Sequence, residues 1–312
     1  MALAQLRFDE QSGVFTAAQL TEAGLSRAEI RSNIDGGRWR ALNEIVVVTH
    51  NGPMTWRQSL WAVYLSAPHP AAICGLTAMA LWGVVGFATE VVHLVVPRGA
   101  RPLEVPGVRL DVHESRRFTS RDIVYGRRPP ATGLTRSTVD AAAWEPHLWT
   151  AFRLFVAPVQ QRLETADRLR AELLSAGRVR HRRQLLALAS DLCGGADALS
   201  EVEFMRFCRR HGFPKPLCQR RMDSSGRWRY LDAELRTADG SVAYIEVDGG
   251  VHLTLAVRSE DTIKDNDANL DGRLVLRYAS AAIYADDPRA VAQIARALGL
   301  VRPTGGYSHR TV

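Results

Sequence analysis

Residues 229–248 read RYLDAELRTADGSVAYIEVD, and this stretch decides the fold of the C-terminal part of the chain. Polar and apolar residues alternate on both sides of Ala238-Asp239-Gly240, which is typical of two strands joined by a tight turn. A three-residue loop with Gly240 in the left-handed conformation predicts a hairpin whose apolar residues face one another. The predicted pairs are Thr237 with Ser241, Leu235 with Ala243, Ala233 with Ile245 and Leu231 with Val247.

The other face of the predicted hairpin carries acidic side chains. The same register sets Asp232 opposite Glu246 and Tyr230 opposite Asp248, whereas a slip of one residue would mix the two faces. Opposed carboxylates repel when their Cβ atoms are about 5 Å apart, so they need a cation or full solvation. Mg²⁺ is commonly held by one or two carboxylates together with water and phosphate oxygens. The hairpin therefore indicates either a magnesium site or an acidic face exposed to solvent.

These acids belong to a longer pattern. Glu203, Asp232 and the run from Glu246 to Gly250 (EVDGG), followed by His252, resemble the restriction-endonuclease-like superfamily, often written PD-(D/E)XK. The very-short-patch-repair-like branch is the most similar, and the likeness covers roughly residues 199–298. It includes a helix that opens with Ser200-x-x-Glu203, a later helix around residues 267–270 and a final strand at residues 274–278.

The resemblance implies hydrolysis of a nucleic-acid phosphodiester. In this superfamily Mg²⁺ activates a water for in-line attack and stabilises the charge that develops on the phosphate oxygens. Asp232 and Glu246 would be its ligands here. The candidate catalytic residues are Glu203, Asp232, Glu246, Asp248 and His252.

The chain departs from the superfamily at the positions around the metal. Asp248 stands where a lysine is common, so His252 or Lys264 would have to orient or deprotonate the water. Asn266 stands where the family usually carries arginine. Glu203 also has a structural alternative, because Ser200-x-x-Glu203 is a capping-box pattern. A degenerate domain that does not cleave therefore remains the alternative.

The N-terminal sequence predicts two short helices separated by a turn. Thr16 is a candidate N-cap for a helix that continues to Ala23 and stops at Gly24. Ser26-Arg27-Ala28-Glu29 is a capping box that opens a second helix. This is the spacing of a helix-turn-helix.

The second helix, residues 27–34, would turn Ile30 and Ile34 inward and its polar residues outward. A turn at residues 36–39 then leads to a β-rich run at residues 44–49, which completes a predicted winged helix. Such a helix enters the major groove of DNA, where Arg and Asn read base edges, while the wing contacts phosphate. A winged helix that binds protein is the alternative. The predicted nucleic-acid-binding residues are Arg27, Arg31, Asn33 and Arg38.

Residues 7–143 resemble the N-terminal domain of the AbiEi antitoxin family. Besides the predicted winged helix, the resemblance rests on residues 73–83 (ICGLTAMALWG), the strand 91–97 (VVHLVVP) and residues 132–140 (TGLTRSTVD). Antitoxins of this family resemble repressors of their own operons, so the resemblance implies DNA binding and a cognate toxin as partner. Asn43-Glu44-Ile45-Val46 replaces the usual Gly-Val-Tyr start of the wing strand.

Length and composition are those of a chain with several ordinary cores, because 46% of its 312 residues are hydrophobic. We predict an α+β protein with a winged helix-turn-helix, a mixed α/β middle with a helical connector, and a restriction-endonuclease-like core. The predicted division is 1–52 winged helix-turn-helix, 53–143 AbiEi-like α/β region, 144–195 helical connector, 196–301 restriction-endonuclease-like domain and 302–312 flexible tail.

Basic residues concentrate in the N-terminal part of the chain. The segment before Gly195 carries 23 basic and 17 acidic residues, and the segment after it carries 17 and 16. This excess is expected of a main DNA contact, although 38 of the 40 basic residues are arginine, which can also reflect genomic base composition. Residues 144–192 are helical by pattern. They include a basic cluster whose members Arg180, Arg182 and Arg183 either follow phosphates or form a solvated helix start.

The four cysteines have irregular spacings and form no Cys-x-x-Cys pair, which argues against a disulfide framework. We therefore expect a reducing, cytoplasmic compartment. No apolar run approaches the length that a membrane span needs, so we expect no membrane partner. The favoured function is Mg²⁺-dependent hydrolysis of nucleic acid by a DNA-binding protein. The alternative is a non-enzymatic antitoxin or transcriptional regulator, and a protein adaptor without a nucleic-acid role is the third class.

Overall fold

The computed structural model describes residues 8–87, 89–193, 196–224, 227–237, 240, 242–248 and 275–300. Helices and mixed sheets make an α+β protein, as predicted. The chain divides into two compact units, Met1–Ala141 and Ala142–Val312, which we describe separately. The finer five-part division stays a prediction. Among the described residues, no helix has the length and apolar character that a membrane crossing requires.

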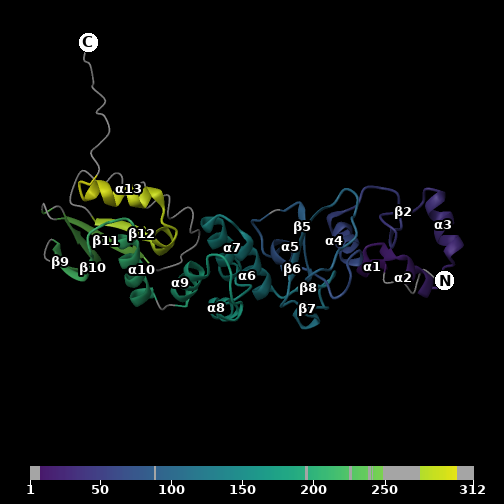
Figure 1. Ribbon diagram of the computed structural model, residues 1–312, viewed down its shortest axis with the longest axis horizontal. Helices are drawn as coiled ribbons and strands as arrows, with labels where there is room; N and C mark the ends of the chain where they lie inside the picture. The colour runs from purple at the N-terminus through teal and green to yellow at the C-terminus, as the bar shows by residue number, and fades with distance from the viewer. Residues whose placement is uncertain are drawn as a thin grey trace, which may run out of the picture. The chain divides into compact units, whose positions relative to one another are not determined.

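The first unit begins with the short helices α1, α2 and α3 (Figure 1) and with the strands of a small antiparallel sheet of order β1-β3-β2. Val14 pairs with Val48 in this sheet, and Arg40 pairs with Val48 from the other side. Val47 turns inward with Phe15, Leu20 and Ile30 to form a small core. The elements are α1 (Phe8–Gln11), β1 (Val14–Thr16), α2 (Ala17–Glu22), α3 (Arg27–Asp35), β2 (Arg40–Ala41) and β3 (Val46–Val48).

The predicted helix starts in this region are confirmed. Thr16 and Ser26 are N-caps, and each forms a reciprocal capping box with the residue three positions later. Gly24 has a φ of 96°, a left-handed conformation that suits glycine. It allows the amide of Leu25 to donate to the carbonyl of Leu20, which closes α2 and turns the chain into α3.

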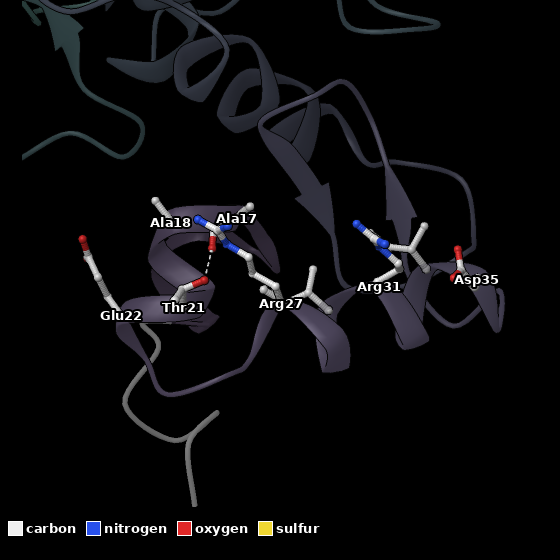
Figure 2. A pocket seen from close by; sticks show the side chains of 9 residues that line it. Ala17, Ala18, Thr21, Glu22, Arg27, Arg31 and Asp35 are labelled. Atoms are coloured by element: carbon white, nitrogen blue, oxygen red, sulfur yellow. Dashed lines mark hydrogen bonds between the residues drawn. The ribbon is translucent and has the colours of Figure 1, made fainter.

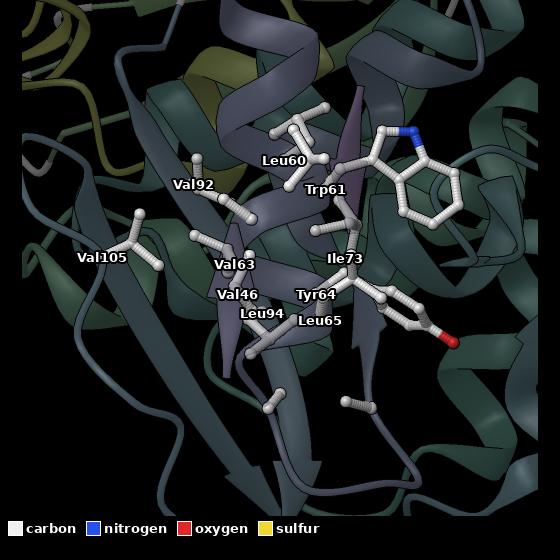
Figure 3. Packing of buried hydrophobic residues seen from close by; sticks show 14 of the residues in the cluster. Val46, Leu60, Trp61, Val63, Tyr64, Leu65, Ile73, Val92, Leu94 and Val105 are labelled. Atoms are coloured by element: carbon white, nitrogen blue, oxygen red, sulfur yellow. The ribbon is translucent and has the colours of Figure 1, made fainter. Parts of the chain in front are cut away.

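A five-stranded sheet of order β6-β5-β4-β8-β7 forms the rest of the first unit. Helix α4 contributes buried residues such as Leu60 and Val63, which pack with Leu94 of the sheet (Figure 3). The strand predicted at residues 91–97 is confirmed as β5. The elements are α4 (Trp56–Leu65), β4 (Ala72–Ile73), α5 (Gly75–Leu81), β5 (Val91–Pro97), β6 (Arg109–Ser115), the 3-10 turn η2 (Ser120–Asp122), β7 (Ile123–Val124), β8 (Ala131–Thr132) and α6 (Leu134–Trp144).

The second unit starts with helices in the range predicted to be helical and continues into a four-stranded sheet of order β12-β11-β10-β9. Strands β9, β10 and β11 form an antiparallel meander, and β12 is parallel to β11. The elements are α7 (Leu148–Gln160), α8 (Ala166–Ser175), α9 (Arg182–Leu192), α10 (Ala196–Arg210), β9 (Leu217–Ser224), β10 (Arg227–Arg236), β11 (Val242–Asp248), β12 (Val275–Ala279), α12 (Ser280–Tyr284) and α13 (Pro288–Ala297).

The predicted hairpin register is confirmed where its pairs are described. Ala233 pairs with Ile245 and Leu235 pairs with Ala243. Gly240 has a φ of 91°, as a left-handed loop residue requires. These apolar residues pack against Phe204 and Phe207 of α10 and against α13 in one core. Alternation therefore leaves the other face of the sheet to the polar residues.

The expectation that a helix opens at Ser200 is wrong, and so is the alternative that Ser200 and Glu203 form a capping box at its start. Helix α10 begins at Ala196, so Ser200 lies in its second turn and cannot cap its start. The residues 196–199 are Ala-Asp-Ala-Leu, and alanine and leucine are strong helix formers that extend the helix in the N-terminal direction. Glu203 thus lies inside the helix, and its burial needs another explanation.

A buried carboxyl in the second unit makes folding pH-dependent. The hydroxyl of Tyr284 donates to Oδ2 of Asp191 over 2.8 Å, and burial raises the pKa of Asp191 from 3.8 to about 6. The protonated Asp191 carboxyl therefore stabilises the folded state fully at a pH below its pKa in the unfolded chain. This stabilisation is lost as the pH rises through its pKa in the folded protein. We expect the unfolding free energy of the wild type, relative to Asp191→Asn, to fall by about 2–3 kcal/mol between about pH 4 and pH 7.

Chemical denaturation of both proteins across this range measures the difference. Glu172→Gln on α8 is the matched control. The substitution removes the same charge as Asp191→Asn, but Glu172 is only half-buried. A difference between wild type and Asp191→Asn that stays constant with pH would contradict the proposed burial of the carboxyl.

Candidate functional site

The polar face of α3 is the first candidate site. Helices α2 and α3 line an open groove of about 800 Å³. Thr21 and Glu22 lie on one side of it, and Arg27, Arg31 and Asp35 lie on the other (Figure 2). Arg27 is the first residue of α3 and Arg31 follows one turn later, so both lie on the same face. Both are exposed, while Ile30 between them is buried. The face can therefore present two guanidinium groups to an anionic partner.

Asn33 and Arg38 bind each other rather than pointing outward independently. Nε of Arg38 donates to Oδ1 of Asn33 over 2.7 Å, and Nδ2 of Asn33 donates to the carbonyl of Glu29 over 2.9 Å. Arg38 also donates to the carbonyl of Ser32. The Asn33 amide is thus used within the helix and its C-terminal turn, and Arg38 adds its charge to the end of α3.

Acidic groups limit the positive charge of this face. Glu22 and Asp35 line the groove beside the arginines. Glu29 accepts from the backbone amide and the hydroxyl of Ser26, and these hydrogen bonds lower the pKa of its carboxyl. The negative charge of Glu29 stabilises the N-terminus of α3, where the helix dipole is positive. The basic character of the face therefore comes from Arg27 and Arg31, with Arg38 at its end.

The turn between β2 and β3, which was predicted to be a wing that contacts phosphate, is tied to its own unit. Nδ2 of Asn43 donates to Oγ of Ser66 over 2.7 Å and to the carbonyl of Glu104 over 3.1 Å. Oδ1 of Asn43 accepts from the amides of Ile45 and Val46. Asparagine at the start of this turn therefore fixes both its shape and its position.

The acidic face of the hairpin is the second candidate site. The described register ends at the pair of Ala233 with Ile245, one residue before the predicted pair of Asp232 with Glu246. Glu246 is described and half-buried. The side chains of Asp232 and Asp248 lie outside the described residues, as do His252, Lys264 and Asn266 of the predicted site.

Glu246 has a basic partner on the neighbouring parallel strand. Its register partner in β12 is Arg277, and Nε of Arg277 donates to Oε2 of Glu246 over 2.7 Å. The side chains are 37% and 58% exposed. An exposed ion pair of this kind contributes about 0–1 kcal/mol, so a stronger ligand for either partner can replace it.

Glu203 is buried beside arginines. It pairs with Arg206 one turn later on α10, and its Oε2 lies 3.7 Å from Nε of Arg183 at the start of α9. The neighbouring residue Phe204 packs into the core on the apolar face of the sheet, opposite to the face of Glu246. The Glu203 carboxylate pairs with Arg183 and Arg206, whereas the Glu246 carboxylate pairs with Arg277. The described ion pairs of the two carboxylates therefore share no residue.

The predicted basic cluster has mixed roles. Arg182 donates to the carbonyls of Leu173, Leu174 and Gly177, so it completes the C-terminus of α8. Arg183 faces Glu203, as described above. Arg180 is exposed. Of the three arginines, Arg182 has a structural role and Arg183 has an acidic partner, and the contact of Arg180 with phosphate stays a prediction.

One cluster was missed by the sequence analysis. His93 of β5 and Asp111 and His113 of β6 bring one nitrogen or oxygen each within 4.8 Å of one another. The two imidazole rings are stacked, with an angle of 13° between their planes. The alternation of RLDVHES at residues 109–115 would have predicted a strand with Asp111 and His113 on one face. No local signal connects that strand with β5.

Known protein-family models give no match to this chain, and no curated protein is significantly similar to it.

Proposed function

We propose that the protein binds double-stranded DNA through the outer face of α3. The observation that carries this proposal is the exposure of Arg27 and Arg31 on a helix that α2 and the three-stranded sheet hold from behind. The four-residue turn between α2 and α3 contains Gly24, as in helix-turn-helix motifs. The order α1, β1, α2, α3, β2, β3 fits a winged helix-turn-helix and supports the same role.

The chemistry of this face suits DNA. A recognition helix contacts base edges through its N-terminal residues, which is where Arg27 lies, and Arg31 follows on the same side. Arginine donates two hydrogen bonds to O6 and N7 of guanine, and it also neutralises phosphate. Glu22 and Asp35 beside the arginines would repel a backbone that is out of register, which favours one docking geometry. Such a role belongs in the cytoplasm.

Footprinting with the full-length protein tests this proposal. DNA upstream of the protein's own gene is the first target, and fluorescence anisotropy at several salt concentrations measures affinity. We expect a protected site and an affinity that falls steeply as salt rises, because binding releases counterions. The absence of both protection and salt-dependent binding would refute a DNA-binding role.

Mg²⁺-dependent phosphodiester hydrolysis at the hairpin is the second candidate function. It is favoured by the described hairpin register, whose continuation by one pair would set Asp232 opposite Glu246, and by a meander followed by a parallel strand. Asp232 and Glu246 would hold the ion, and Mg²⁺ would polarise the phosphate and activate water. Glu203, Asp248 and His252 are the further candidates for positioning or proton transfer at this site.

The ion pairs of the acids favour a competing candidate, a regulator or antitoxin that does not cleave. Glu203 faces two arginines and Glu246 faces Arg277, so both carboxylates have partners without a metal. A cognate toxin would be its partner. A cleavage assay on supercoiled plasmid and structured RNA over a metal series separates the two. Nicking that requires Mg²⁺ or Mn²⁺ supports hydrolysis, and DNA binding without strand breaks supports the regulator.

A further inference from the structure

The cluster of His93, Asp111 and His113 lies on the edge of the five-stranded sheet of the first unit and shares no residue with the face of α3 or with the hairpin. Strand β6 is the edge strand and runs parallel to β5, with His93 as the register partner of Asp111. His113 follows Asp111 by two residues and therefore lies on the same face. Val92 and Leu94, which flank His93, point to the opposite face and into the core. The buried neighbours hold the imidazole of His93 at this face.

The three ligand atoms form a nearly regular triangle. Nδ1 of His93 lies 3.2 Å from Nε2 of His113, and Oδ2 of Asp111 lies 3.7 Å from the first atom and 3.4 Å from the second. A tetrahedral Zn²⁺ ion with bonds of about 2.0–2.1 Å separates its ligand atoms by roughly 3.3 Å. The triangle thus has the size of three corners of a zinc tetrahedron.

We propose that His93, Asp111 and His113 bind a divalent transition-metal ion of the zinc class. Two imidazole nitrogens and one carboxylate oxygen suit zinc and its neighbours in the periodic table. Mg²⁺, in contrast, takes oxygen ligands and keeps several waters, so this site differs in chemistry from the magnesium site proposed at the hairpin. The zinc-class site is therefore independent of the proposed DNA-binding and hydrolytic functions.

The side chains of both histidines are largely buried beside the carboxylate of Asp111. A neutral imidazole has the lone pair that a metal requires. The carboxylate of Asp111 supplies a negative charge that partly balances the charge of the ion.

One side of the site is open to solvent. The side chains of His93 and His113 are 17% and 16% exposed, whereas that of Asp111 is 53% exposed. An ion held by the three residues would therefore have a position accessible to water or to a small anionic ligand. Three protein ligands and one open position are typical of sites that bind an exchangeable ligand rather than of closed structural sites.

A hydrogen bond between the two imidazoles is the competing explanation, because one neutral ring can donate to the other over 3.2 Å. Zinc titration of the tag-free, full-length protein after chelator treatment decides between them. We expect one tightly bound Zn²⁺ per chain, and Co²⁺ in its place should give the strong visible absorption of a tetrahedral site. Less than one bound Zn²⁺ per chain in the wild type would overturn the proposal.

Variants locate the ion. We expect Asp111→Asn and His113→Gln to weaken Zn²⁺ binding by more than about 100-fold, because loss of second-sphere partners alone costs 10-fold to 100-fold. Asp111 is exposed, so Asp111→Asn reports on the site even where a histidine variant fails to fold. His147→Ala, which removes an exposed histidine elsewhere, should bind Zn²⁺ like the wild type. Unchanged Zn²⁺ affinity in Asp111→Asn together with loss in His147→Ala would overturn the assignment.

Discussion

Glu246→Ala is expected to abolish Mg²⁺-dependent strand cleavage, with a loss of at least about 100-fold in rate at saturating DNA, while DNA binding is retained. A metal ligand stabilises charge that develops in the transition state, so its removal lowers the rate of the chemical step more than the affinity for substrate. Asp232→Ala, on the facing strand, should have the same effect. Single-turnover cleavage of a labelled duplex with a titration of Mg²⁺ measures both variants.

Arg277→Ala separates metal binding from the ion pair with Glu246. If the pair only holds β11 to β12, removal of either partner should have the same consequence. The effect should be small, because the Arg277 side chain is 58% exposed and that of Glu246 is 37% exposed. If Glu246 binds Mg²⁺, Arg277→Ala should keep cleavage and leave the Mg²⁺ requirement in place. Thr237→Ala at the end of the same hairpin is the neutral control. Cleavage that survives in both Glu246→Ala and Asp232→Ala would exclude this site as the source of activity.

The hairpin could be predicted from sequence because local signals fix its register. Gly240 determines the loop, and the alternation around Ala233 and Ile245 admits one pairing that keeps the apolar residues together. Strand β9, in contrast, was not predicted, although Asp223, Ser224 and the following Ser-Gly are turn-forming residues that could have indicated a second hairpin.

Contacts between parallel strands could not be predicted, because no short turn joins such strands and the intervening chain sets their register. The pair of Glu246 with Arg277 depends on β11 and β12, and the cluster of His93 with His113 depends on β5 and β6. Burial of Glu203 was missed for a related reason. Its partner Arg183 belongs to another helix, and helix packing is not encoded in the spacing of either segment.

The capping signals at the N-terminus predicted the two helices, but they did not predict which hydrogen bonds each polar side chain makes. Thr16 and Ser26 act within three residues, so their effect is visible in sequence. Asn33 was predicted to face outward for base recognition, and its amide is used by Arg38 and by the Glu29 carbonyl. Asparagine often binds nearby backbone groups, which is why its position on a helix does not by itself indicate a ligand.

The double variant Arg27→Ala/Arg31→Ala is expected to weaken binding to the footprinted DNA by about 100-fold to 1,000-fold. Each bidentate contact with a base contributes roughly 1–3 kcal/mol, and each is lost with its guanidinium group. The helix should persist, because alanine has a higher helix propensity than arginine and both side chains are exposed. Fluorescence anisotropy with the footprinted site and with unrelated DNA measures affinity and specificity together.

The salt dependence of binding distinguishes base contacts from phosphate contacts. An arginine that contacts phosphate lowers the slope of log affinity against log salt by about one when it is removed, whereas one that reads a base chiefly reduces discrimination between sequences. Arg121→Ala, which removes an exposed arginine from η2 in the same unit, is the control for net charge and should leave affinity and slope nearly unchanged. Equal losses in Arg121→Ala and in the single variants Arg27→Ala and Arg31→Ala would mean that the total charge of the unit, and not the face of α3, attracts DNA.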